Sequence, residues 1–214
     1  MSGADPEVPL PPADTEPDEG PSPVAGPSPA LIAARYRMLA IVSFLVVVTD
    51  QIVKRWVVGF FGNVEGRTRT IVPGFFDLIL TRNPGAAWGM LGTLKPDALR
   101  IAVFVLISLA AIAMVIWLAR KARVEQRLLV SALALVLGGA LGNLVDRIVA
   151  GRVVDFLDFY THAEWFMGLA AKVHYACDAG LGCHWPAFNV ADICISVGVA
   201  LLVLESFLSP PRKT

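Results

Sequence analysis

Residues 101–119 read IAVFVLISLAAIAMVIWLA, a run without a single charged side chain that follows closely on Pro96, Asp97 and Arg100. A helix needs about 20 residues to cross a hydrocarbon core of roughly 30 Å, so this stretch is typical of a transmembrane helix. Its length and uniform apolarity predict that the fold is built in a bilayer.

The composition of the whole chain points the same way. Hydrophobic residues make up 56% of the 214 residues, charged residues make up 17%, and the mean hydropathy is +0.64. Soluble domains are roughly 45–50% apolar and about 25% charged. The formal net charge is zero, but six acidic residues lie in the first twenty positions, so residues 31–214 carry a net charge of +6. These cations are scattered around apolar runs, which argues against nucleic acid as a partner.

Three further segments are long enough to span a membrane. They are residues 38–61, 128–149 and 188–208, which together with residues 98–119 predict four spans. Nine of the fifteen prolines lie in residues 1–30, where there is no aromatic residue. Such a composition buries too little apolar surface to offset its ordering entropy. We therefore expect residues 1–34 to be a disordered cytoplasmic tail, residues 35–209 a four-span domain, and residues 210–214 a cytoplasmic C-terminal tail.

Basic residues in the short flanks of the spans indicate the orientation. Arg35 and Arg37, the four basic residues between positions 120 and 127, and the pair Arg212 and Lys213 fall on one side. The total count of basic residues does not separate the two sides, so these short flanks decide the prediction. They place both termini in the cytoplasm.

Two outward segments complete the predicted fold. Residues 69–81 contain Pro73-Gly74, which suits a type II turn between extended runs and predicts a small sheet. Residues 151–187 are rich in aromatic residues, which suit the headgroup zone. The expected fold class is an all-α membrane protein with four transmembrane helices, a small outward-facing β-sheet, and an outward-facing helical or loop insertion.

Ionisable residues at span ends are the candidate functional groups, because a charge costs roughly 2.5–3.5 kcal/mol at the centre of a bilayer. They gather at the outward ends of three spans, and they are Asp50, Lys54, Asp146, Arg147, Asp155, Asp158 and Asp192. This convergence predicts a site near the outer face. Spacing alone does not choose between Asp155 and Asp158. Asp50 and Lys54 are one helical turn apart and fit a snorkelling pair at a span end as well as a supporting role.

Five short stretches in this sequence occur in a characteristic order. They are DQIVK at 50–54, NPGAAW at 83–88, GALGNLVDR at 139–147, GRVVDF at 151–156 and FNVAD at 188–192. In that order they resemble the motifs of the lipoprotein signal peptidase family, also called signal peptidase II, over residues 36–208. Five ordered motifs are far more specific than one short pattern.

The resemblance implies a bacterial inner-membrane aspartyl endopeptidase with its active site near the outer face. Such an enzyme removes the signal peptide from diacylglyceryl-modified prolipoproteins, on the amino side of the lipid-modified cysteine. The family's catalytic aspartates match Asp155 and Asp192. Supporting or substrate-binding roles are implied for Asp50, Lys54, Asn83, Gly85, Gly139, Asn143, Asp146, Arg147 and Asn189. The expected partners are prolipoproteins and membrane lipids, and the expected enzyme is a monomer without a cofactor or metal.

Paired carboxylates suit this chemistry. Held close together in a partly desolvated site, they share one proton. The ionised member takes a proton from the attacking water while the protonated member donates to the scissile carbonyl oxygen.

Other interpretations of these residues remain open in the sequence. Intramembrane carboxylates also fit a small proton- or ion-coupled transporter, and Gly138-x-x-x-Gly142 fits close helix packing, including that of a non-catalytic assembly factor. Asn83 also fits a simple turn.

The insertion between the two matched aspartates holds 36 intervening residues, more than the family usually has. This length leaves the shape of the outer lid open. Its His174, Cys177, Cys183 and His184 are residue types that bind zinc, but in an oxidising compartment the two cysteines equally fit a disulfide or free thiols.

Overall fold

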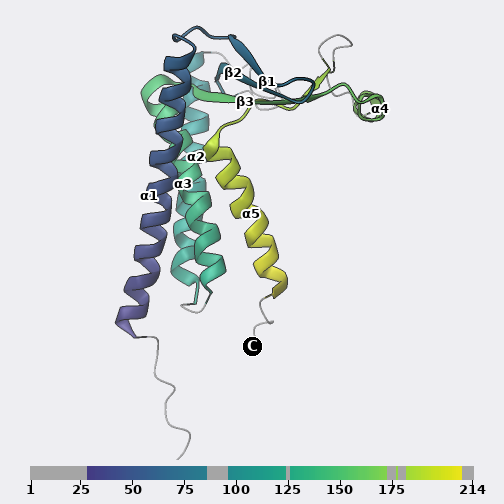
Figure 1. Ribbon diagram of the computed structural model, residues 1–214. Helices are drawn as coiled ribbons and strands as arrows, with labels where there is room; N and C mark the ends of the chain where they lie inside the picture. Colours follow the sequence, from purple (N-terminus) through teal and green to yellow (C-terminus); the bar gives the residue numbers. More distant parts are fainter. Residues whose placement is uncertain (1–27, 86–95, 124–125, 173–176, 178–181, 209–214) are drawn as a thin grey trace, which may run out of the picture.

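The computed structural model describes residues 28–85, 96–123, 126–172, 177 and 182–208. Within these residues, four helices are long and apolar enough to cross a membrane. They are α1 (Pro29–Phe60), α2 (Asp97–Lys121), α3 (Arg127–Ala150) and α5 (Val190–Leu208). They run lengthwise beside one another, with a small sheet at one end of the bundle (Figure 1). The four spans predicted from hydropathy are confirmed.

Helix α1 begins earlier than the sequence analysis placed the first span. Ser28 is the N-cap, its hydroxyl accepts from the backbone N–H of Leu31, and Pro29 opens the helix. Residues 29–34, expected to be part of the tail, are therefore helical, because a capping Ser-Pro pair precedes good helix formers. The rest of the predicted tail lies outside the described residues. Arg35 then donates a hydrogen bond to the carbonyl of Ala122 at the end of α2, which ties the two helices together.

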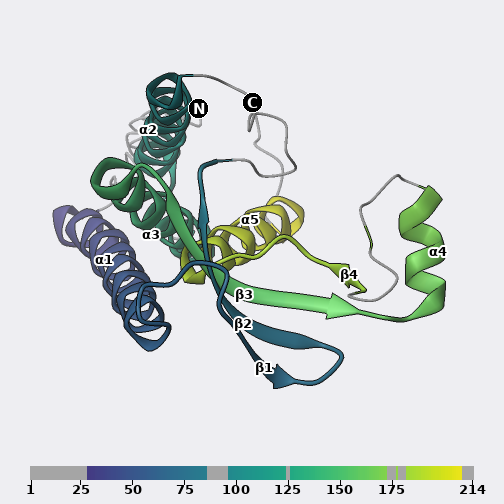
Figure 2. The same cartoon turned by 90° about the horizontal axis from the view of Figure 1, so that it is seen from above.

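Helix α3 is the central helix of the bundle. In its most apolar window 56% of the residues are buried, against 11% in each of the other three spans. Glycines on α3 allow this close packing. A Cβ at Gly138 would lie 2.6 Å from Val46 Cβ on α1, and a Cβ at Gly139 would lie 2.4 Å from the carbonyl oxygen of Ala191 on α5. Viewed from above, α3 lies between α1, α2 and α5 (Figure 2).

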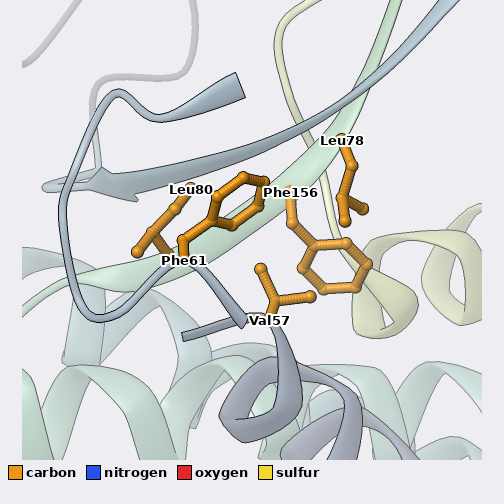
Figure 3. Packing of buried hydrophobic residues seen from close by; sticks show 5 residues of the cluster. All are labelled: Val57, Phe61, Leu78, Leu80 and Phe156. Atoms are coloured by element: carbon orange, nitrogen blue, oxygen red, sulfur yellow. The ribbon is translucent and has the colours of Figure 1, made fainter. Parts of the chain in front are cut away.

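The sheet lies across one end of the bundle (Figure 1). Its antiparallel strands are β1 (Thr68–Val72), β2 (Phe76–Asn83), β3 (Val153–Thr161) and β4 (Cys183–His184), in that order. The predicted turn is present between β1 and β2, where Gly74 has φ +78°. A buried cluster of Val57, Phe61, Leu78, Leu80 and Phe156 fixes the sheet to the end of α1 (Figure 3).

The insertion is a long excursion from β3 that returns along the same strand. It contains α4 (Glu164–Lys172), which lies far from the bundle (Figure 2). On the return, Trp185 N–H donates to the carbonyl of Phe159 at 2.7 Å, and Phe188 exchanges backbone hydrogen bonds with Leu157 at 2.9 and 3.1 Å. Residues 183–188 therefore run antiparallel to β3 until α5 begins.

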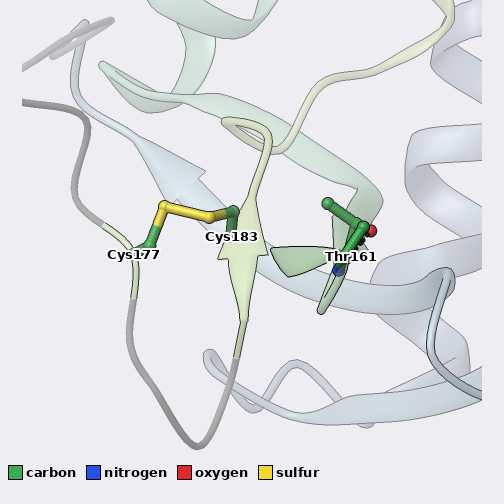
Figure 4. The surroundings of a disulfide bond; sticks show 4 residues. Thr161, Cys177 and Cys183 are labelled. Atoms are coloured by element: carbon green, nitrogen blue, oxygen red, sulfur yellow. Dashed lines mark hydrogen bonds between the residues drawn. A yellow bond between two sulfur atoms is a disulfide. The ribbon is translucent and has the colours of Figure 1, made fainter. Parts of the chain in front are cut away.

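A disulfide joins Cys177 to Cys183 within this insertion (Figure 4). Both sulfurs are used in the bond, so neither is a thiolate that would bind zinc. The two remaining candidate zinc ligands are His174 and His184, and His174 lies outside the described residues. Among the described residues, no group of three or more His, Cys, Asp or Glu side chains is placed to hold a metal ion.

The disulfide should stabilise the insertion without being required for the spans. The bond closes a loop with a sequence separation of 6, for which chain entropy gives about 2 kcal/mol. We expect the Cys177→Ser/Cys183→Ser double variant to lose up to that amount in unfolding free energy and to keep its helical content. Denaturant unfolding and circular dichroism in detergent check this, and loss of the folded bundle would contradict it.

Candidate active site

Asp155 lies in β3 and is almost completely buried, with 2% of its surface exposed. Its carboxylate accepts a hydrogen bond of 2.6 Å from the side-chain amide of Asn189. The side chain of Asn83, at the end of β2, donates a second one. Two neutral donors therefore orient this carboxyl group.

Asp192 is the third residue of α5 and forms a capping box with Asn189. The side-chain oxygen of Asn189 accepts from the Asp192 N–H at 3.0 Å, and the Asp192 carboxylate accepts from the Asn189 N–H at 3.3 Å. Asn143 on α3 donates to the other oxygen of Asp192 at 2.8 Å. The helix N-terminus favours a negative charge at this position.

Asn189 brings the two aspartates together. Its amide nitrogen binds Asp155 while its backbone N–H binds Asp192, and the residue is fully buried. Because the chain entering α5 is paired with β3, the length of the insertion does not alter this juxtaposition. The structure thus pairs the two aspartates chosen in the sequence analysis.

The environment of Asp155 favours its protonated form. Burial, and then the negative charge of Asp192, raise its pKa to about 7, partly offset by the hydrogen bonds from Asn83 and Asn189. A carboxyl group that holds a proton near neutral pH is what a general acid requires.

Asp158 occupies a different environment from Asp155. It is three positions further along β3, so its side chain points to the opposite face of the strand. Its carboxylate lies 2.9 Å from Nδ1 of His184, and its cross-strand neighbour is Asp77. The alternation of side chains along β3 therefore separates Asp155 from Asp158. The sequence spacing alone did not separate them, because residues 153–161 had not been assigned to a strand.

Lys54 holds the supporting residues in place. Its ammonium lies 2.8 Å from Asp50 and 2.9 Å from Asp146, and it donates to the side-chain oxygen of Asn143 at 3.0 Å. Lys54 is 3% exposed and Asp50 is 0% exposed. The snorkelling interpretation of this pair is wrong, because the charges face the bundle instead of water.

Asp50 and Asp146 each connect this cluster to another element. Asp50 accepts from the N–H of Ala191 at 3.0 Å, so a carboxylate from α1 helps to cap α5. Asp146 accepts from the backbone N–H of Val154 in β3 at 3.1 Å and from the side chain of Gln51 at 2.8 Å. Gln51 stands in the quoted DQIVK stretch, but the sequence analysis assigned it no role.

The remaining predicted residues shape the rim of the site. Asn83 accepts from the N–H of Gly85 at 2.8 Å, so it forms a local turn as well as binding Asp155. Gly85 has φ +101°, and a Cβ there would overlap the ring of Phe104. Arg147 stacks over the same ring at 5.5 Å and interacts electrostatically with Asp192 and Asp155. Phe104 is a contact that the sequence analysis missed. Residues 86–88 of the NPGAAW stretch lie outside the described residues.

A bundle of membrane spans that carries two neighbouring carboxyl groups at one end fits the class of membrane-embedded aspartic peptidases, and a match to a known family selects this class. The family model for signal peptidase (SPase) II matches residues 42–208. The chain belongs to the signal peptidase II family, and this membership replaces the transporter and assembly-factor alternatives.

Named relatives and solved structures agree with this assignment. A lipoprotein signal peptidase of Syntrophotalea carbinolica is 39% identical over 81% of this chain and 93% of its own length. One of Symbiobacterium thermophilum is 40% identical over 83% and 99%. Two solved structures described as bacterial membrane enzymes share the fold, with TM-scores of 0.60 and 0.59. They are 24% and 25% identical, and the likeness covers 82% and 81% of this chain and 92% and 94% of theirs.

The raised pKa of Asp155 predicts a specific effect of pH on stability. Because the folded-state pKa, about 7, exceeds the ordinary value of 3.8, the native state binds this proton more tightly than the unfolded state. Its contribution to stability is therefore full below about pH 4 and is lost as pH rises to about 7. Asp155→Asn cannot ionise and should escape this loss, gaining up to about 4 kcal/mol relative to the parent between pH 4 and pH 8. Unfolding curves in detergent at both pH values check this, and a constant difference between the two proteins would contradict it.

Proposed function

We propose that this protein cleaves the signal peptide from diacylglyceryl-modified prolipoproteins, with Asp155 and Asp192 as the catalytic pair. The observation that carries the proposal is that one buried residue, Asn189, binds both carboxyl groups, Asp155 through its side-chain amide and Asp192 through its backbone N–H. The names of the relatives, lipoprotein signal peptidases, supply the substrate class.

The environments of the two carboxyl groups suit different roles. Asp155 is buried and its pKa is about 7, so it is the member that holds the shared proton at neutral pH. Asp192 is partly exposed, and its side chain lines an open groove beside α5. A water molecule between the two loses a proton to Asp192 as it attacks the scissile carbonyl carbon, while Asp155 donates its proton to the carbonyl oxygen.

Breakdown of the tetrahedral intermediate reverses these roles. The proton taken by Asp192 passes to the leaving amine, the C–N bond breaks, and the carbonyl reforms as its hydroxyl proton returns to Asp155. Asn143 and Asn189 keep both carboxyl groups oriented throughout, because amide donors bind a carboxyl group without adding charge. Arg147 adds positive potential beside the pair.

The protein is proposed to lie in the inner membrane with both termini in the cytoplasm and the site near the outer face. The start of α1 and the end of α5 both lie at the end of the bundle opposite the sheet (Figure 1). The hydrogen bonds from Arg35 to Ala122 and from Gln126 to Glu205 lie at that end, beside the basic residues of positions 120–127. Positive charge favours the cytoplasmic side. A lipid-modified substrate then reaches Asp192 laterally from the outer leaflet.

Replacing either catalytic aspartate should abolish turnover. Asp155→Asn and Asp192→Asn keep the size of the side chain but cannot exchange the proton, so each should lower kcat by at least about 10³-fold. The double variant should be little worse than either single one, because the pair acts as a unit. Cleavage of a diacylglyceryl prolipoprotein in detergent, followed by product mass, measures this.

Asp158→Asn is the matched control in the same strand. It removes a carboxylate three positions away that faces His184, and it should retain most activity. An inactive Asp158→Asn variant beside an active Asp155→Asn variant would overturn the choice of catalytic residue.

The orientation has its own test. Single cysteines introduced as Arg123→Cys and Trp165→Cys in a Cys194→Ser background should differ in reactivity toward a membrane-impermeant maleimide. In intact spheroplasts only the cysteine at position 165 should react, and both should react after lysis. Labelling at position 123 from outside would reverse the orientation.

A further inference from the structure

An apolar groove lies next to Asp192 on the lipid-facing side of α5. It has a volume of about 320 Å³ and is lined by Trp185, Phe188, Asp192, Ile193, Ser196 and Val197. The reaction steps above use only Asp192 of these six residues. Because the groove continues directly from a proposed catalytic carboxylate, its occupant is a part of the substrate close to the scissile bond.

We infer that this groove binds the glyceryl ester end of the substrate's diacylglyceryl group. In this inference Ser196 donates a hydrogen bond to an ester carbonyl, and Trp185 packs against the glyceryl and first acyl carbons. The inference rests on the proposed function, because it assumes a diacylglyceryl-cysteine substrate. It assigns specificity to two residues outside the matched motifs.

The polarity of the groove fits an ester. Ester carbonyls accept hydrogen bonds and donate none, so they need a donor in an otherwise apolar wall. Ser196 supplies a hydroxyl, and within the described residues its side chain has no hydrogen-bond partner. Ser196 is exposed and lines the groove, so its hydroxyl lies within reach of a ligand there.

The position of Ser196 fits the geometry of the substrate. It lies one helical turn, about 6 Å, from Asp192 along α5 toward the membrane interior. In diacylglyceryl cysteine, the cysteine side chain, the thioether sulfur and glyceryl carbons separate the scissile amide from the ester carbonyls. A donor for those carbonyls must therefore be displaced from the catalytic carboxylate toward the acyl chains.

The size of the groove limits it to part of the lipid. A volume of 320 Å³ is at the lower end of the range for small-molecule sites, so it accommodates the ester region and not two long chains. The chains can continue along the exposed face of α5, where Ile193, Val197 and Leu204 are 41%, 46% and 47% exposed. These three positions repeat with helical spacing, so they form one apolar track into the bilayer.

Trp185 is placed over the groove by the insertion. Its backbone N–H donates a hydrogen bond to the carbonyl of Phe159. The two preceding residues are fixed by the disulfide at Cys183 and by the contact of His184 with Asp158. Trp185 is 54% exposed. A large ring that is apolar on its faces and polar at one edge suits the boundary between an ester and an acyl chain. The insertion thus adds a specificity residue to the site.

The test compares two synthetic lipopeptides that carry the same peptide, one with a dipalmitoylglyceryl ester and one with the matching dialkyl ether. Ser196→Ala should raise KM for the ester about two- to tenfold, with kcat nearly unchanged, because it removes one hydrogen bond. It should not change KM for the ether, which lacks the carbonyls. Ser196→Thr, which retains the hydroxyl, should restore the preference for the ester, and Ser206→Ala on the same helix is the matched control.

Trp185→Ala should raise KM for both lipopeptides about tenfold, because it removes apolar contact rather than a hydrogen bond. Trp165→Ala, an exposed tryptophan that does not line the groove, is its control. Equal effects of Ser196→Ala on ester and ether, or a Trp185→Ala variant that matches Trp165→Ala, would overturn the inference while leaving the proposed function intact. Failure of the unmodified protein to cleave either lipopeptide would instead overturn the proposed function, and this inference with it.

Discussion

The need to neutralise one buried ammonium group organises the end of the bundle that carries the sheet. Lys54 lies among membrane-spanning helices at 3% exposure, and the three oxygens around it come from Asp50, Asn143 and Asp146. Loss of either carboxylate would weaken the compensation of this buried charge, and loss of Asn143 would leave one of its N–H groups without an acceptor, so each change is expected to destabilise the fold. Because these acceptors also bind α5 and β3, the contacts that neutralise Lys54 also fix the two elements that carry Asp192 and Asp155.

Much of this arrangement was predictable from the sequence, for identifiable reasons. A uniformly apolar segment of about 20 residues forms a helix in a bilayer, because only a helix pairs all of its backbone polar groups within one segment. The four spans could therefore be predicted from hydropathy. The convergence of charged residues followed once the spans were ordered. Asp155 and Asp158 can be told apart only once residues 153–161 are known to form a strand. Successive side chains of a strand point to opposite faces, so two residues three positions apart lie on different faces. The early start of α1 and the roles of Gln51 and Phe104 depend on caps and contacts that leave only weak signals in a single sequence.

The insertion illustrates how a variable segment leaves a site intact. The chain leaves the site just after Asp155 and returns to it at Asn189, and backbone pairing between Leu157 and Phe188 aligns the two ends. The rest of the insertion is connected to the site through this backbone pairing. A change in the length of the insertion therefore leaves the positions of the two carboxyl groups unchanged. The same pairing places Trp185 beside the groove next to Asp192. In the inference above, the insertion thereby affects substrate specificity without contacting the reacting groups.

The carboxyl groups of Asp155 and Asp192 are bound by amides and not by the buried cation. Lys54 donates to Asn143, Asn143 donates to Asp192 and accepts from Asn189, and Asn189 donates to Asp155. A lysine in direct contact with Asp155 would stabilise the ionised form and lower its pKa, which would remove the proton that the proposed mechanism requires. Amide side chains transmit position through this chain of hydrogen bonds while adding no formal charge. The cluster therefore fixes the geometry of the pair and still permits one proton to be shared between them.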